Sequence, residues 1–237
     1  MLHFQNVNLP GTNRLEVDLG YDTDVFTSTA GGSFWTRPIN VRAFASGNVP
    51  VRYITSGAPT GSVQIDRYGR GERHAGGPGH PSFSNSDPFL PDPVYTEPTY
   101  DPFWYCANPP NWENVQCIPG GDIRAQVAKS VGMIVSVHPP DSYSPSEYVS
   151  TCSVTLVDSD KVISAGHCHS PDEALTSSVI FGYETDCAGN RLAGYSPRFH
   201  KVTVALKFRY DPTAGIDYSL LQLKTSPAGI APIQLRH

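Results

Sequence analysis

The stretch CSVTLVDSDKVISAGHCHS, residues 152–170, begins with a cysteine and places a histidine directly before a second cysteine. His167 could be a structural histidine beside a disulfide, a metal ligand together with His169, or a general base that takes a proton from a nucleophile. Side chains adjacent or two apart on a strand or turn do not converge well on one ion, and no C-x-x-C or H-E-x-x-H motif adds ligands. The sequence therefore implies no metal and no organic cofactor.

A carboxylate that could serve this histidine occurs fifty residues later, in GIDYSLLQLKTSP. A general base must hold one imidazole nitrogen toward the nucleophile, and a carboxylate on the other nitrogen fixes that tautomer. Asp217 precedes an apolar run typical of a strand, and its type suits this role. Without His167, the same aspartate would be interpreted as a turn residue before an edge strand.

Together the two motifs resemble the histidine and aspartate motifs of trypsin-like (chymotrypsin-fold) serine proteases. In that family, C-x-G-[ST]-L opens a strand, [ST]-A-A-H-C follows, and the aspartate lies in D-[IV]-A-L-L-x-L. Val154 stands where the family usually has glycine, and Gly166 replaces the second alanine. The positions that match are Cys152, Thr155, Leu156, Ser164, Ala165, His167 and Cys168 in the first motif and Asp217, Leu220, Leu221 and Leu223 in the second.

The resemblance implies peptide-bond hydrolysis through an acyl-enzyme, with a protein or peptide as the substrate. His167 would act as general base and then general acid, and Asp217 would orient it at about 2.6–3.2 Å. The resemblance also implies a disulfide between Cys152 and Cys168, and a secreted protein. It covers about residues 127–237, which correspond to the first of the family's two β-barrels.

The nucleophile does not occur where the resemblance places it, after Asp217. Neither G-D-S-G-G nor G-x-S-x-G is present, and Ser33 in GGSFW and Ser56 in TSGAP precede the histidine. We therefore expect a fragment of a protease that lacks the barrel with the serine and the oxyanion donors, and no peptidase activity from residues 1–237. The alternative is a non-catalytic homologue that uses the first barrel as a secreted binding module.

The segments around these motifs predict an all-β chain. Residues 1–68 contain short strand-like segments separated by Gly, Pro and Asn turns, which is typical of a small antiparallel β-sandwich: 2–9, 14–21, 33–44, 49–56 and 62–68. Residues 122–237 contain six further candidates for the strands of a barrel: 131–137, 152–157, 161–165, 178–182, 202–208 and 218–223.

Residues 69–121 are rich in proline, which blocks helices and removes strand donors, so they predict a linker or an extended wrapping segment. Five cysteines leave one without a partner in an oxidising compartment. Cys106 and Cys117 are close in sequence and are predicted to pair. Cys187 would then be the odd cysteine.

Composition and charge exclude several classes of function. A net charge of −5 gives no electrostatic reason to bind nucleic acid, and no apolar run is long enough for a membrane span. The first residues, MLHFQNVNLPGTN, lack the features of a signal peptide, as expected for an incomplete start. Phe34 and Trp35 either pack in the core of residues 1–68 or let this segment contact a polysaccharide by stacking on its sugars.

Overall fold

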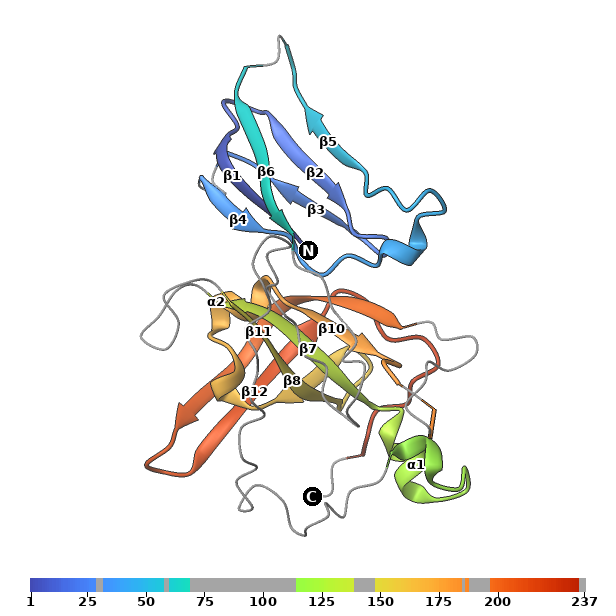
Figure 1. Cartoon of the computed structure of the whole chain (residues 1–237). Coiled ribbons are helices and arrows are strands. Elements are labelled where there is room, and N and C mark those ends of the chain that lie inside the picture. The colour runs from blue at the N-terminus through green and yellow to red at the C-terminus, as the bar shows by residue number, and fades with distance from the viewer. Residues whose placement is uncertain are drawn as a thin grey trace, which may run out of the picture.

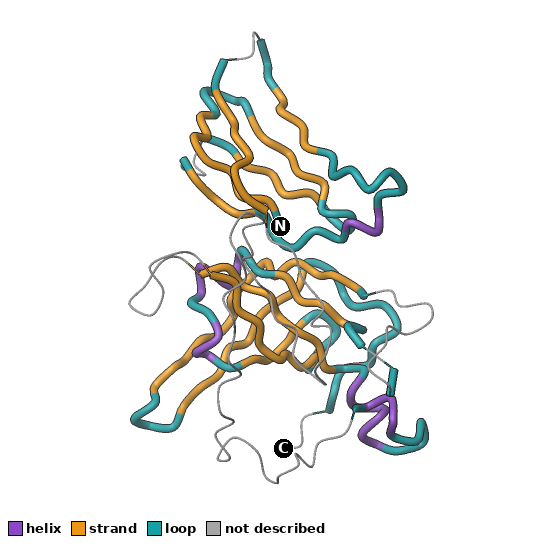
Figure 2. The backbone as a smooth tube through the Cα atoms, in the orientation of Figure 1, coloured by secondary structure: helices purple, strands orange, loops and turns teal. Residues whose placement is uncertain are grey.

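The computed structural model describes residues 1–28, 32–57, 60–68, 114–138, 148–184, 186–187 and 197–234. Within these residues the chain is all-β, as predicted, with two small sheets followed by a closed barrel (Figure 1). The few helices are short, and they lie at the periphery of the barrel except for one 3-10 helix beside the amino-terminal sheets (Figure 2). None of the helices in the described ranges is long and apolar enough to cross a membrane.

The amino-terminal strands form two three-stranded antiparallel sheets that share one core. The sheet orders are β4-β1-β6 and β3-β2-β5. In β2, Leu15 and Val17 are buried and alternate with more exposed polar residues, so that the apolar side of the strand meets the core. Phe4, Leu9 and Leu19 complete the buried centre. The strands are β1 (Leu2–Asn8), β2 (Arg14–Asp18), β3 (Thr23–Phe26), β4 (Ser33–Trp35), β5 (Val51–Ile54) and β6 (Ser62–Tyr68).

Two features of these sheets differ from the sequence prediction. The strand predicted over 33–44 ends at Trp35, since Pro38 lacks an N–H and restricts Arg37, and a short 3-10 helix η1 (Val41–Ala43) follows. The strand β3 was not predicted, because Asp22 and Asp24 are unfavourable strand residues. Phe34 stacks on Phe26 with ring centroids 4.0 Å apart, so it belongs to the core.

The carboxy-terminal part is a six-stranded antiparallel barrel in which the strands follow the order β10-β11-β12-β9-β8-β7. All six predicted strands are present, and the hairpin of β11 and β12 extends beyond the barrel wall (Figure 1). Ile134, Leu156, Val162, Phe181 and Leu221 fill the interior. The strands are β7 (Val131–His138), β8 (Tyr148–Leu156), β9 (Lys161–Ser164), β10 (Ser178–Phe181), β11 (Arg198–Asp211) and β12 (Ile216–Leu223).

Two short helices adjoin the barrel, α1 (Ile123–Ala128) and α2 (Pro171–Leu175), and neither was predicted. The start of α2 is nevertheless encoded locally. Ser170 and Glu173 form a reciprocal capping box, and Pro171 occupies the first turn, where its missing N–H costs no hydrogen bond. The sequence S-P-D-E carries this signal.

The disulfides correct one prediction. Cys117 is bonded to Cys187, so the predicted Cys106–Cys117 pair is wrong, and Cys187 is not the odd cysteine. The 3-10 helix η3 (Val115–Cys117) lies against the segment after β10, where Asn114 Nδ2 donates to the Asp186 carbonyl at 3.0 Å. Cys106 lies outside the described residues, as does the predicted linker up to residue 113.

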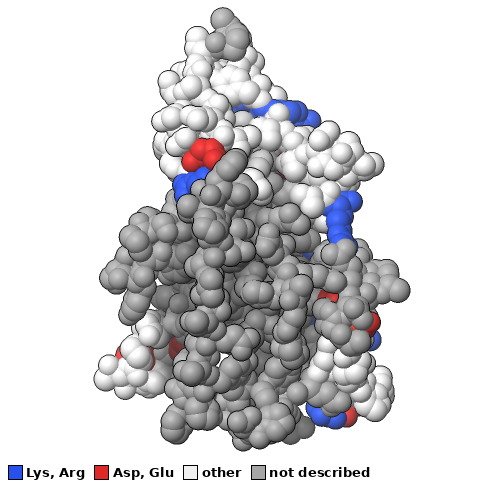
Figure 3. Space-filling view, in the orientation of Figure 1, with Lys and Arg blue, Asp and Glu red and all other residues white. Residues whose placement is uncertain are grey.

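The two β units contact each other through polar groups and one aromatic pair. The Tyr21 ring stacks on Phe199 with centroids 5.1 Å apart, and its hydroxyl lies 2.9 Å from Ser178 Oγ. Lys201 Nζ, from β11, lies 3.1 Å from Asp24 Oδ1 and 3.4 Å from Asp22 Oδ2. Among the described residues visible in Figure 3, charged groups are scattered and form no large patch of one sign.

Candidate active site

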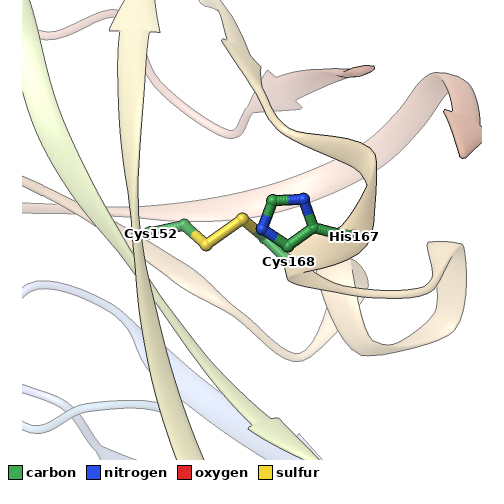
Figure 4. A group of neighbouring side chains, drawn as sticks. All are labelled: Cys152, His167 and Cys168. Carbon is green, nitrogen blue, oxygen red and sulfur yellow. A yellow bond between two sulfur atoms is a disulfide. The ribbon is translucent and has the colours of Figure 1, made fainter. Parts of the chain in front are cut away.

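The turn that carries His167 is attached to the barrel at two points. β9 ends at Ser164, Ala165 is extended, and the 3-10 helix η4 (Gly166–Cys168) follows. The buried Cys168 is bonded to Cys152 in β8, with Cα atoms 6.2 Å apart (Figure 4). The predicted Cys152–Cys168 disulfide is therefore confirmed. It fixes the backbone directly beside the histidine.

Gly166 allows this turn to approach the β11–β12 hairpin closely. A Cβ added at Gly166 would lie 2.5 Å from the Arg209 carbonyl oxygen and 3.0 Å from the Tyr218 carbonyl oxygen. Both contacts are with strand backbone, which cannot move aside as a side chain does. The alanine usual in the resembling family does not fit this turn without a backbone shift.

We expect Gly166→Ala to destabilise the protein by about 1–3 kcal/mol, the usual cost of overpacking a tight site. Urea unfolding of the purified variant measures this difference. Gly215→Ala is unsuitable as a control because its backbone has a positive φ. Gly120→Ala has no heavy atom within 4 Å of the added Cβ and should change the unfolding free energy little. Equal effects of both variants would contradict the close approach.

Asp217 lies near the start of β12 and accepts two hydrogen bonds from His167. Its Oδ2 lies 2.6 Å from the imidazole Nδ1, and its Oδ1 accepts the His167 backbone N–H at 2.9 Å. The distance predicted from the two motifs is confirmed. With the proton on Nδ1 the imidazole donates to the carboxylate, which leaves Nε2 as the free basic nitrogen. The catalytic role of both residues stays a prediction.

These contacts set the electrostatics of the pair. Hydrogen bonds from the His167 imidazole and backbone, with a further one from the Gly166 N–H, lower the pKa of the Asp217 carboxyl below its usual value. The His167 side chain is 56% exposed and that of Asp217 35% exposed, so solvent reaches the site. An ionised Asp217 is what holds the Nδ1–H tautomer at neutral pH.

The lowered pKa of Asp217 gives a pH prediction. A carboxyl that binds its proton less tightly in the folded state stabilises the fold above the unfolded pKa, and this contribution is lost as pH falls through the folded pKa. A ¹³C NMR titration should find a midpoint for Asp217 below about 3.9. The midpoint should move toward that value in His167→Ala, and an unchanged midpoint would show that the imidazole does not cause the shift.

A buried polar pair supports the turn from behind. His169 Nε2 lies 3.1 Å from Ser219 Oγ, which in turn donates to the Ala165 carbonyl at 3.4 Å. Burial lowers the pKa of His169, so the neutral ring is favoured. His169 is thus a structural residue. The sequence analysis considered His169 only as a metal ligand. It could not reveal the contact with Ser219, which lies fifty residues further along the chain.

The sulfur and nitrogen atoms of Cys152, His167 and Cys168 lie within 4.8 Å of one another (Figure 4). The two sulfurs are bonded to each other, so they supply no thiolate for a metal. His167 Nδ1 is already committed to Asp217. This donor set does not fit a metal ion.

The surroundings of His167 include exposed apolar side chains but no nucleophile among the described residues. No serine, threonine or cysteine in the described ranges hydrogen-bonds to His167. Tyr210, which faces Asp217 across the hairpin, has its ring 6.1 Å from the imidazole in an edge-on arrangement. Three residues that precede Tyr210 in β11 are also exposed: Val204, Leu206 and Phe208.

Comparison with known proteins finds no matching family model and no similar curated protein. The interpretation of the site therefore rests on its own residues. The structure brings His167 and Asp217 together at the end of a closed antiparallel barrel, and this architecture is compatible with the barrel expected from the resemblance.

Proposed function

We propose that residues 122–234 are the base-bearing barrel of a secreted serine endopeptidase of the trypsin-like kind. The observation that carries this proposal is the double contact of Asp217 with His167, through both the imidazole and the backbone. A surface ion pair needs only one such contact. Two contacts fix both the position of the histidine and the tautomer of its ring.

In the proposed reaction, His167 Nε2 accepts the proton of a serine hydroxyl as that oxygen attacks the peptide carbonyl. The imidazolium then returns the proton to the leaving amine, and water repeats the cycle on the acyl-enzyme. Asp217 stays ionised throughout and stabilises the imidazolium. The Cys152–Cys168 disulfide keeps the turn of the base in place during both proton transfers.

The nucleophile and the oxyanion donors are proposed to come from a second barrel that packs beside the β11–β12 hairpin. Exposed Phe208 and Tyr210 support this proposal, since such side chains are suited to be covered at an interface. Two disulfides support an extracellular location, because such bonds persist in oxidising compartments.

The test uses the complete reading frame that contains this sequence. Its product should cleave casein, and the cleavage should be lost in His167→Ala while circular dichroism shows an unchanged fold. A folded product of the complete frame without peptidase activity would overturn the proposal and favour the non-catalytic binding module.

A further inference from the structure

A second histidine, in the amino-terminal sheets, lies between a carboxylate and a serine. His3 Nδ1 lies 2.5 Å from Asp66 Oδ1, and His3 Nε2 lies 2.9 Å from Ser33 Oγ. The three residues come from the neighbouring strands β1, β6 and β4 of one sheet. With the proton on Nδ1, the imidazole donates to Asp66 and accepts from the Ser33 hydroxyl. This is the hydrogen-bond order of a Ser-His-Asp triad.

The three residues differ in exposure, and the histidine is the most buried of them. His3 is 1% exposed, whereas Ser33 is exposed at the sheet surface. Asp66 carries a lowered pKa: burial raises it, but hydrogen bonds and charge from His3 and Arg67 outweigh burial. The base is thus shielded from water, the carboxylate is ionised, and the hydroxyl can be reached from solvent.

Arg67 holds the base and its carboxylate in this arrangement. The Nη2 atom of Arg67 lies 3.1 Å from Nε2 and 3.2 Å from Nδ1 of His3. An atom nearly equidistant from both ring nitrogens lies above the plane of the imidazole, not within it. Arg67 Nη2 therefore does not occupy the in-plane lone-pair direction of Nε2, and Ser33 Oγ lies 2.9 Å from this nitrogen. Arg67 Nε also contacts Asp66 Oδ2 at 3.2 Å, and the Trp35 ring packs 4.9 Å from the imidazole.

The position of Ser33 on an edge strand provides a backbone donor. Thr36 N–H donates to the Leu2 carbonyl and the Gly32 carbonyl accepts from Val7, so the even-numbered residues of this segment face β1. By alternation, the Ser33 N–H points away from β1, toward the outer edge of the sheet. A backbone N–H beside the nucleophile can stabilise a developing oxyanion.

We propose that Ser33, His3 and Asp66 form a second nucleophilic site that transfers acyl groups from carboxylic esters to water. Ser33 Oγ bonds to the ester carbonyl carbon while its proton passes to His3 Nε2. The tetrahedral intermediate collapses, the ester C–O bond breaks, and the leaving alkoxide takes the proton from His3. Water then attacks the acyl-serine with the same proton transfers and releases the carboxylic acid. Asp66 stays ionised and orients His3.

A third histidine shows why the exposure of Ser33 matters. His138 lies 2.5 Å from Ser150 Oγ and 3.2 Å from Glu173 Oε1, which also looks like a relay. There the other oxygen of Glu173 accepts the Ser170 N–H in the capping box of α2, and Ser150 is only partly exposed. That group is explained by its role in joining α2 to β7 and β8. The group around Ser33 includes no helix terminus.

The experiment treats the full chain with diisopropyl fluorophosphate and locates the adduct by peptide mass spectrometry. We expect one adduct, on Ser33, formed at least about 100-fold faster than in His3→Gln, as is typical for loss of a general base. Ser62→Ala is the matched control: an exposed serine of the same sheet whose Oγ only donates to the Asn6 carbonyl. It should be labelled like the wild-type chain, and its initial rate of p-nitrophenyl acetate hydrolysis should be unchanged.

Ser33→Ala removes an exposed side chain, so it should stay folded, lose the adduct and lose the ester hydrolysis above the background rate. If His3→Gln does not fold, the mapped adduct in the wild-type chain and its loss in Ser33→Ala decide the question. A folded wild-type chain with no adduct on Ser33, or with Ser33 labelled no faster than Ser62, overturns the proposal.

Discussion

Replacing Asp217 by asparagine in the proposed full-length protease should lower kcat about 10⁴-fold, the loss seen when this carboxylate becomes an amide in a Ser-His-Asp triad. An amide can donate to the imidazole Nδ1, and the ring then carries its proton on Nε2, where the serine proton has to be accepted. The geometry barely changes, because asparagine has the size of aspartate. The loss should therefore appear in kcat more than in KM.

The control for this prediction is Asp158→Asn, which changes an exposed carboxylate that pairs with Lys161 in the turn before β9. It removes the same charge outside the His167–Asp217 pair and should leave kcat within about twofold, since surface ion pairs contribute little. Peptidase kinetics with a chromogenic substrate measure both variants. Equal kcat values for Asp217→Asn and the wild-type protease would show that His167 is not the base.

The local part of the candidate site could be predicted from the sequence. The Cys152–Cys168 disulfide and the approach of Asp217 to His167 were both expected from two motifs that resemble those of one family and occur in the same order. The first motif spans β8, β9 and the turn that follows, so the disulfide within it is local. The contact of His167 with Asp217 joins positions fifty residues apart, and only the resemblance of both motifs to one family indicated it. The barrel strands were predicted because Val-rich and Ile-rich runs bounded by turns are local signals.

The remaining features depend on contacts between distant positions. Cys117 meets Cys187 only because the segment before α1 packs against the loop after β10, and cysteine spacing alone cannot show this. The contact of His3 with Asp66 joins strands that are neighbours in the sheet but sixty-three residues apart in the chain. Ser33 was set aside in the sequence because it precedes His167, although its own base lies at the amino terminus.

Asp24→Asn should destabilise the whole protein by about 3–5 kcal/mol, because it removes one partner of a buried ion cluster. The Asp24 side chain is 2% exposed. It accepts from Arg37 Nη1 at 2.6 Å and from the Arg37 backbone N–H at 2.9 Å, and Lys201 Nζ lies 3.1 Å away. Lys201 belongs to the barrel, and its side chain is only 9% exposed. Without the carboxylate, Arg37 loses its ion pair, and Lys201 keeps only the longer of its ion pairs, with Asp22 at 3.4 Å.

The matched control is Glu16→Gln, in the same pair of sheets. Glu16 pairs with Arg14 at 2.7 Å and Arg52 at 3.7 Å, but both arginines are solvent-exposed, so the loss should stay below about 1 kcal/mol.

Urea unfolding followed by circular dichroism compares the two variants. If the sheets and the barrel unfold together, Asp24→Asn lowers the midpoint of one common transition. If they unfold separately, both midpoints fall, since each unit loses the other's support. An effect of Asp24→Asn no larger than that of Glu16→Gln would show that the cluster does not join the two units, and the barrel would then present His167 without help from the amino-terminal sheets.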